Sequence, residues 1–399
     1  MDRLERVRAR PRSVSRKRSE PGASTPSIAG SEPKTRDEKS APYRDARYEF
    51  NLEKVGVFMR DSEQGITEKS RALCKRLLEE TQTPPTDSLF RSDLFDETCR
   101  DLQTRNEARV LRDIGMLLVP SAETLRKLGD RTLGSLIESV NESWSNCYPL
   151  DPSRLTPARP QPDYSLGFRR EAFTDEQLQR LEPLIGDAFS QSYFAATYRM
   201  YFPFYTSEVK CGREGLDVAD RQNAHSMAIA VRAVVALFKE VGREKELDGE
   251  ILTFSVSHDN ESVRIYGWYP AIGAKTTTHR RTIRKFNFTE LDGRDKWTTD
   301  TFTKNVYRIY MPKFLDLIQS AIDELPPDLL SWARFDPVGS EHSGLSQQLE
   351  GQSISEGGGL EQETPDSSQQ SSKRTKPTQG SLADATESEH GAERGSRKV

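Results

Sequence analysis

The pattern of apolar and polar positions predicts one folded region between two polar ends. Apolar residues recur at strand-like or helix-like spacing through the middle of the chain and become scarce on either side. The strand-like runs lie at 164–168, 201–211, 251–257, 263–269 and 276–288, and helices are predicted at 68–80, 92–117, 120–144 (in pieces), 175–193, 217–241 and 303–325. This order predicts an α/β domain with a mixed central sheet flanked by helices.

The predicted organisation is a single domain, residues 48–335, between two disordered tails. Residues 1–47 are basic and rich in Arg, Ser and Pro, and residues 336–399 are rich in Ser, Gln, Gly and Glu. Neither segment can bury enough apolar surface to offset the entropy lost on ordering. Within the domain we expect a helical N-terminal part at 66–146 and a catalytic core at 160–325.

Charge and cysteine usage narrow the class of protein. The net charge of −4 excludes a uniformly basic coat, although a local basic patch could still bind nucleic acid. The four cysteines lie far apart, which predicts no disulfide framework, no disulfide-linked partner and no zinc site. No apolar run approaches the ~20 residues that span a bilayer, so we expect an intracellular protein without membrane contact. Basic clusters at 16–18 and 373–376 are candidate nuclear localisation signals, and a solvated tail in a cytoplasmic protein is the alternative.

Two strand ends carry the residues that indicate a chemistry. Asp163 precedes one predicted strand, and Glu208 and Lys210 lie at the polar end of another. Since side chains alternate along a strand, Glu208 and Lys210 point to the same side. Two carboxylates and the carbonyl oxygen of Val209 are ligands that Mg²⁺ or Mn²⁺ prefers, and a lysine can stabilise charge that develops on a phosphate. The pattern therefore indicates metal-dependent phosphodiester cleavage.

Each of these residues also has an ordinary structural explanation. Asp163 follows a proline and could merely begin a turn, and Glu208 with Lys210 could form an exposed ion pair that contributes at most about 1 kcal/mol. The same acid-x-lysine spacing recurs at 32–34 and 37–39, within the predicted N-terminal tail. Only the copy at Glu208 ends an apolar strand and precedes a long helix, which favours a functional site there.

Further polar residues are secondary candidates. Glu107 lies on the apolar stripe of a predicted helix, where a carboxylate needs a reason, and a role in the site and a salt bridge to an arginine explain it equally well. Gln222, near the start of the long helix, could face the site or serve as a helix-packing amide. A basic stretch in the last predicted strand could bind nucleic-acid phosphates or form a solvated strand edge, and its members are Lys275, Arg280, Arg281, Arg284 and Lys285.

Four segments together carry a resemblance to a known family. They are Arg159-Pro160-Gln161-Pro162-Asp163-Tyr164, Tyr201-Phe202-Pro203-Phe204, Ser207-Glu208-Val209-Lys210-Cys211-Gly212 and Ala219-Asp220-Arg221-Gln222-Asn223-Ala224-His225-Ser226. They resemble an uncharacterised fungal domain that is similar to the PD-(D/E)XK nuclease superfamily, which has the restriction-endonuclease-like fold. The likeness covers about residues 85–328.

The resemblance implies a role for each matched position. Asp163 and Glu208 would ligate the metal, Lys210 would be catalytic, and Glu107 would correspond to the extra acidic residue that some members carry on the first core helix. The gap between Asp163 and Glu208 is long for the superfamily and must hold an inserted helix.

The expected function is that of a Mg²⁺- or Mn²⁺-dependent endonuclease or exonuclease, a hydrolase acting on DNA rather than RNA. The alternative is a catalytically inactive module that keeps the fold and binds nucleic acid or a protein partner. A secreted or injected effector with a nuclear target is a third interpretation, and the missing signal peptide counts against it.

Overall fold

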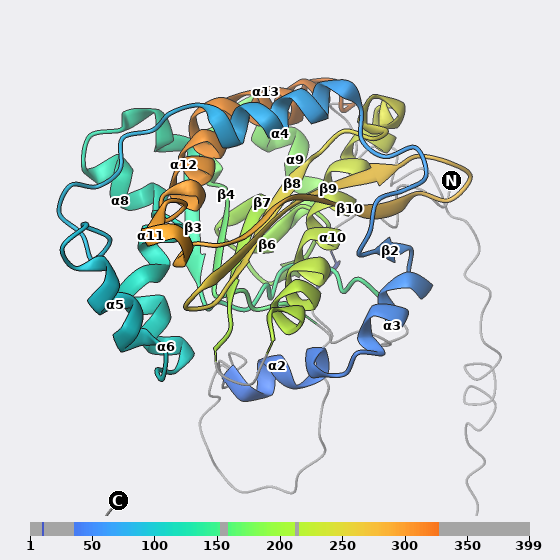
Figure 1. Cartoon of the computed structure of the whole chain (residues 1–399). Coiled ribbons are helices and arrows are strands. Elements are labelled where there is room, and N and C mark those ends of the chain that lie inside the picture. The colour runs from blue at the N-terminus through green and yellow to red at the C-terminus, as the bar shows by residue number, and fades with distance from the viewer. Residues whose placement is uncertain (1–9, 12–35, 152–158, 212–214, 327–399) are drawn as a thin grey trace, which may run out of the picture. The chain divides into compact units, whose positions relative to one another are not determined.

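The structure is a computed structural model, and it describes residues 10–11, 36–151, 159–211 and 215–326 (Figure 1). The predicted α/β architecture is confirmed, because one eight-stranded sheet with parallel and antiparallel pairs is flanked by helices. The predicted C-terminal tail, most of the predicted N-terminal tail and both basic clusters lie outside the described residues.

The sheet follows the order β2-β10-β9-β8-β7-β4-β3, and β6 pairs with β7 beside that path. Its strands are β2 (Val57–Phe58), β3 (Leu136–Val140), β4 (Tyr164–Phe168), β6 (Ala195–Thr197), β7 (Met200–Val209), β8 (Thr253–His258), β9 (Ser262–Ala271) and β10 (Thr277–Asn287). The β7–β8 and β2–β10 pairs are parallel, and the other pairs are antiparallel. A separate two-stranded sheet joins β1 (Arg10–Pro11) to β5 (Ser190–Gln191).

The centre of the sheet is covered on both faces. Every residue of β4, β7 and β8 is buried, as expected for central strands that helices cover on both faces. The long helix α10 (Leu216–Glu240) joins the parallel strands β7 and β8, as a parallel pair requires a crossover connection. Its buried small residues, among them Ala224, Ala228 and Ala233, let the helix approach the sheet closely.

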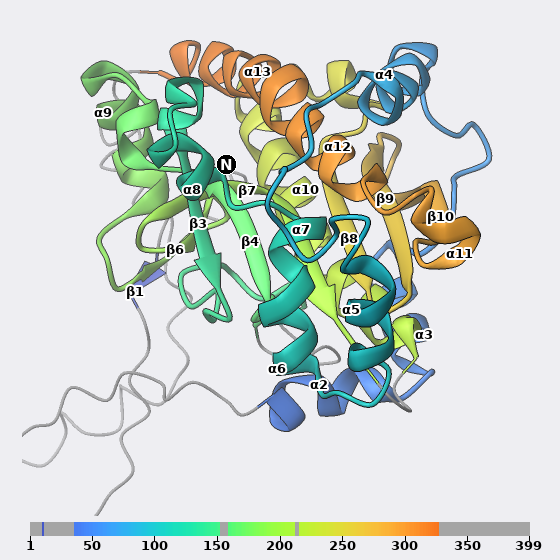
Figure 2. The same cartoon turned by 60° about the vertical axis from the view of Figure 1, so that its left-hand side comes forward.

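A second set of helices packs on the opposite face of the sheet. Tyr205 of β7 donates to or accepts from Thr303 of α12 (Thr298–Asn305), whereas its neighbour Thr206 contacts α10. Because adjacent strand residues face opposite sides, α12 and α10 lie on opposite faces. A π-helical turn (Val306–Tyr310) links α12 to α13 (Met311–Asp323), and α4 (Glu68–Glu79) packs on α12 (Figure 2). The predicted last helix is thus divided near Pro312, as expected.

The predicted helix at 92–117 is wrong as a single element. It is divided into α5 (Phe95–Leu102), α6 (Glu107–Val110), a π-helical turn at 111–115 and α7 (Met116–Leu118). The side chain of Asn106 accepts a hydrogen bond from the backbone N–H of Arg109, at 3.0 Å, and so begins a new helix inside the predicted one.

The predicted continuation of the next helix to residue 144 is also wrong. After α8 (Ala122–Lys127) the chain passes Gly129, at φ +124°, and a 3₁₀ turn (Arg131–Ser135) before it forms the strand β3. Downstream, α9 (Asp175–Ile185) ends at Gly186, at φ +72°, short of the predicted residue 193. Even so, α9 is the helix expected in the gap between the first acidic residue and the second. A short helix, α11 (Glu290–Gly293), follows β10.

The predicted boundary of the N-terminal tail is contradicted by α2 (Arg36–Arg44), which packs on the domain ahead of α3 (Tyr48–Lys54). Tyr43 of α2 and Tyr48 and Leu52 of α3 belong to the hydrophobic core. A few well-placed side chains order this segment, although its average composition is polar.

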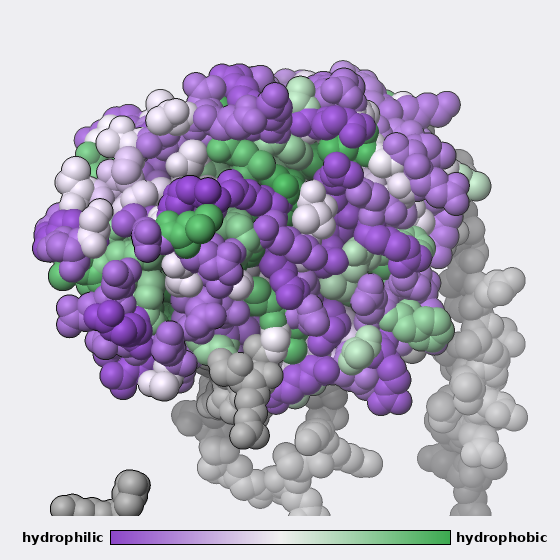
Figure 3. Space-filling view, in the orientation of Figure 1, coloured by the Kyte–Doolittle hydropathy of each residue, from purple (hydrophilic) through white to green (hydrophobic). Residues whose placement is uncertain are grey.

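Of the described helices, none combines the length and hydrophobicity that a membrane span requires. In the part of the chain that the structure describes, none of the four cysteines forms a disulfide bond. The face shown in Figure 3 is mostly hydrophilic, with hydrophobic side chains in limited patches.

Candidate functional site

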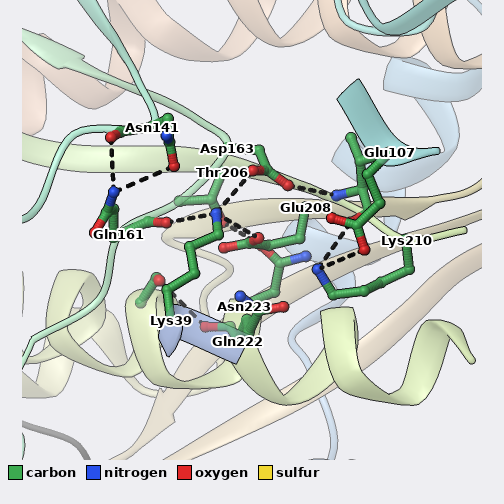
Figure 4. A network of polar contacts seen from close by, with 12 residues as sticks. Lys39, Glu107, Asn141, Gln161, Asp163, Thr206, Glu208, Lys210, Gln222 and Asn223 are labelled. Carbon is green, nitrogen blue, oxygen red and sulfur yellow. Dashed lines mark hydrogen bonds and ion pairs between the residues drawn. The ribbon is translucent and has the colours of Figure 1, made fainter. Parts of the chain in front are cut away.

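The register of two neighbouring strands brings the predicted acidic residues together. β4 and β7 are antiparallel, and Tyr164 lies opposite Ser207. Asp163, one residue before Tyr164, is therefore opposite Glu208, one residue after Ser207. Figure 4 shows both carboxylates within one network of polar contacts.

Asp163 is fully buried and held from two sides. Its Oδ2 accepts a hydrogen bond from the backbone N–H of Val209, at 2.9 Å, and its Oδ1 accepts one from Lys39 Nζ, at 2.7 Å. Both contacts fix the carboxylate in place. The position is therefore a built part of the interior, and not the exposed turn that a Pro-Asp pair could also form.

Glu208 lies beside Asp163 and is also buried. Burial raises its pKa to about 8; the ammonium of Lys39 opposes the shift, the charge of Asp163 adds to it, and Lys210 opposes it. Its Oε2 lies 3.7 Å from Lys39 Nζ and accepts no hydrogen bond from the described residues. A cation that bound both carboxylates would therefore displace a proton from Glu208.

Lys210 is completely buried, so the alternative of an exposed ion pair at the strand end is wrong. Its Nζ donates a hydrogen bond to the carbonyl of Val209, at 2.8 Å, and lies 3.6 Å from Glu107 Oε1. Glu107 lies in the first turn of α6, and it forms this ion pair with Lys210, the predicted catalytic lysine. The structure thus brings together four ionisable residues that are spread over 104 positions of the sequence.

The helix α10 contributes Gln222 and Asn223 to the same network (Figure 4). The side-chain carbonyl of Gln222 is buried and accepts no hydrogen bond in the described part of the chain. Asn223 accepts from the hydroxyl of Thr206, at 2.7 Å, and donates to the carbonyl of Val256 and the hydroxyl of Ser257, each at 3.0 Å. Asn223 therefore fixes α10 on β7 and β8, and so sets the position of Gln222.

Lys39 is the site residue that the sequence analysis missed. Its Nζ donates to Asp163 Oδ1 at 2.7 Å and to the carbonyl of Gln161 at 2.9 Å, and its side chain is 4% exposed. The available signals were weak: Lys39 ends an acid-x-lysine spacing at 37–39, and Lys39 and Tyr43, four residues apart, would share one face if the segment were helical.

The donor set suits a hard cation. Two carboxylates and main-chain carbonyls are oxygen ligands, and Mg²⁺ commonly takes one or two carboxylates and completes its shell with water. Among residues 36–151, 159–211 and 215–326, however, no three His, Cys, Asp or Glu side chains form a metal site by themselves. The ammonium of Lys39 already contacts the oxygens that a metal would use, so the residues fit Mg²⁺ or Mn²⁺ only if Lys39 moves away.

The basic stretch lies apart from this site. Lys275 precedes β10 and the other four residues belong to it, and β9 and β8 separate β10 from β7. Much of its charge is compensated, because Arg281 lies 2.8 Å from Asp61 and Arg284 lies 2.8 Å from Asp295. Arg280 lies 3.6 Å from Asp220 and stacks over Tyr266, and nucleic-acid contact by this strand stays a prediction.

Comparison with known proteins gives a family without an assigned activity. No curated protein matches the chain significantly. Residues 94–322 match a domain of unknown function, DUF7924. The matched range contains every catalytic candidate from Glu107 to Gln222, and it leaves out Lys39 with the rest of α2. Because the match covers more than half of the chain, the protein belongs to the DUF7924 family.

Proposed function

We propose that the domain is a metal-dependent nuclease of restriction-endonuclease-like fold, with DNA as its first candidate substrate. The observation that carries the proposal is the convergence of Asp163, Glu208, Lys210 and Glu107 at one buried place. Buried ionisable groups are costly, and a buried cluster in which desolvation raises the pKa of one carboxyl, here Glu208, is a candidate functional site.

The side chains can be given distinct tasks. Asp163 and Glu208 would hold Mg²⁺ or Mn²⁺, with main-chain oxygens such as that of Val209 nearby. Such an ion, when bound, supplies a more acidic water and positive charge next to a phosphate. Lys210 keeps its ammonium at a fixed place and can stabilise negative charge that develops on the phosphate. Glu107 orients Lys210, and the amide of Gln222 can hydrogen-bond the substrate.

One observation favours a second candidate function, that of a catalytically inactive module that binds nucleic acid or a protein. Lys39 neutralises the carboxylates without any metal, and α2 covers the site. A binding module of this fold would need no metal at this position, because the lysine already balances the buried negative charge. If the partner is nuclear DNA, the basic clusters at 16–18 and 373–376 are candidate nuclear localisation signals.

The test is cleavage of plasmid, single-stranded DNA and RNA by the full chain with Mg²⁺ or Mn²⁺. Glu208→Gln and Lys210→Met should each lower the rate by about 100-fold or more, since both remove groups that act on the reacting phosphate. The matched controls are Glu68→Gln and Lys69→Met, whose side chains are 85% and 82% exposed. Absence of cleavage by a folded protein whose melting temperature does not respond to either metal would instead support the binding module.

A further inference from the structure

The helix α2 places a positive charge at the centre of the acidic site. Lys39 Nζ lies 2.7 Å from Asp163 Oδ1, 2.9 Å from the carbonyl of Gln161 and 3.7 Å from Glu208 Oε2 (Figure 4). The carboxylate oxygens of Asp163 and Glu208 are the ones that a divalent cation would need. An ammonium and a metal ion cannot occupy that position together, so the two states of the site exclude one another.

Few side chains attach α2 to the domain. Among its described side chains Lys39, Ser40 and Tyr43 are buried, whereas Ala41 and Pro42 are exposed. An isolated nine-residue helix with an internal proline is not stable in water, so α2 owes its order to docking.

Polar contacts supply much of that docking. The hydroxyl of Tyr43 lies 2.8 Å from His225 Nδ1, and Arg221 Nε donates to the carbonyl of Tyr43 at 2.6 Å. Both partners belong to α10. Water can replace contacts of this kind when α2 leaves, which keeps the undocked state accessible.

The next helix gives α2 a fixed hinge. In α3, Tyr48 and Leu52 are buried in the core, while the turn at 45–47 is exposed. The hydroxyl of Tyr48 is 3.2 Å from His225 Nδ1, so this histidine keeps a tyrosine neighbour when Tyr43 departs. The segment before the turn can therefore swing out while α3 stays in place.

We propose that α2 is an autoinhibitory gate in which Lys39 competes with the divalent cation for Asp163 and Glu208. This inference rests on the proposed function, because it assumes that the acidic site binds a metal. Since the metal binds only the open form, its apparent dissociation constant rises as the open fraction falls. If α2 is docked about 90–99% of the time, metal binding is weakened about 10- to 100-fold.

The first test uses the unmodified full chain. Lysines are acylated with and without Mn²⁺, and the rate at each lysine is followed by mass spectrometry. Lys304 is the matched control, because it is also buried and pairs with Asp300 at 2.9 Å, but belongs to α12. Mn²⁺ should raise the labelling of Lys39 about tenfold and leave that of Lys304 unchanged.

The second test measures the affinity for Mn²⁺ by calorimetry. Lys39→Met should bind Mn²⁺ about tenfold or more tightly than the wild type, and Asp163→Asn should abolish binding. Lys304→Met should bind like the wild type. If Lys39→Met does not fold, the labelling of the wild-type chain decides by itself.

The outcomes separate the gate from the metal site. Equal, tight Mn²⁺ binding by the wild type and Lys39→Met, with constant labelling of Lys39, would overturn the gate and leave the proposed nuclease intact. If neither the wild type nor folded Lys39→Met binds Mn²⁺, the metal site is wrong and the gate falls with it.

Discussion

The energetic coupling between Lys210 and Glu107 can be measured directly, and it tests whether Glu107 positions the lysine. We consider a double-mutant cycle with Lys210→Met, Glu107→Gln and the combined variant. Met keeps the length of the lysine stem, and Gln keeps the shape of the glutamate. The hydrogen bond from Lys210 to the carbonyl of Val209 is lost with or without Glu107, so it cancels in the cycle.

The expected coupling follows from the geometry of the pair. Lys210 Nζ and Glu107 Oε1 are 3.6 Å apart, with side chains that are 0% and 17% exposed. Two unit charges at such a distance attract by about 4–5 kcal/mol at an effective dielectric constant of about 20, before desolvation is considered. Measured couplings between contacting residues reach about 0.5–3 kcal/mol, so a buried pair should give about 1–3 kcal/mol.

The assay is urea unfolding of the four proteins of the cycle without metal. The control is the exposed pair of Arg71 and Glu68, at 3.0 Å and with side chains that are 53% and 85% exposed. Such a pair should couple by only about 0.3–0.5 kcal/mol. A coupling for Lys210 and Glu107 no larger than that of the surface pair would refute the view that Glu107 positions the lysine.

Three further predictions concern the fold and its surface. Burial lowers the pKa of His225 from 6.5 to about 3. As the pH drops below 6.5, the unfolded chain takes up a proton on this histidine before the folded chain does, so the free energy of unfolding falls. Equilibrium unfolding at about pH 5 should show that the wild type has lost about 2 kcal/mol relative to His225→Gln. In Gly167→Ala the new Cβ would lie 2.6 Å from a side-chain carbon and 2.8 Å from a backbone oxygen. Urea unfolding should therefore show that the free energy of unfolding falls by about 2 kcal/mol or more. The control Gly134→Ala meets nothing within 4 Å and should be nearly neutral. If the basic stretch contacts DNA phosphates, Lys275→Ala and Lys285→Ala should each reduce the slope of log affinity against log salt by about 0.9, and unchanged slopes would assign the stretch to a solvated strand edge.

The central strands were predictable because burial on both faces leaves a strong signal. The run at 164–168 matches β4 residue for residue, and the run at 201–211 matches β7 to within two residues at each end. The edge strand β3 was missed because its mixed residues extend the polar pattern of the preceding helix. The divided helix at 92–117 was missed because one capping amide, that of Asn106, outweighs a continuous apolar stripe.

The candidate site shows what a sequence can and cannot supply. The acidic residues and the lysine were found from their positions at strand ends and from the resemblance. Their distances depend on the pairing of Tyr164 with Ser207 across a long insertion, and no local pattern encodes that register. The resemblance also assigned Glu107 to the site, whereas its charge pattern alone pointed equally well to an arginine partner.

The role of Lys39 could not be predicted from the sequence, because the composition of a whole segment hides the contribution of a single side chain. The acid-x-lysine spacing at 37–39 was visible, but it lay in a stretch whose mean polarity predicted disorder. Charge balance is the stronger argument: even with Glu208 protonated, the buried carboxylate of Asp163 needs a counter-cation, and Lys210 is held by Glu107 and the carbonyl of Val209. The counter-cation must then be a metal ion or another lysine. The chain provides the lysine on a small, hinged helix, so the same oxygens can be neutralised in either of two ways, and release of α2 decides between them.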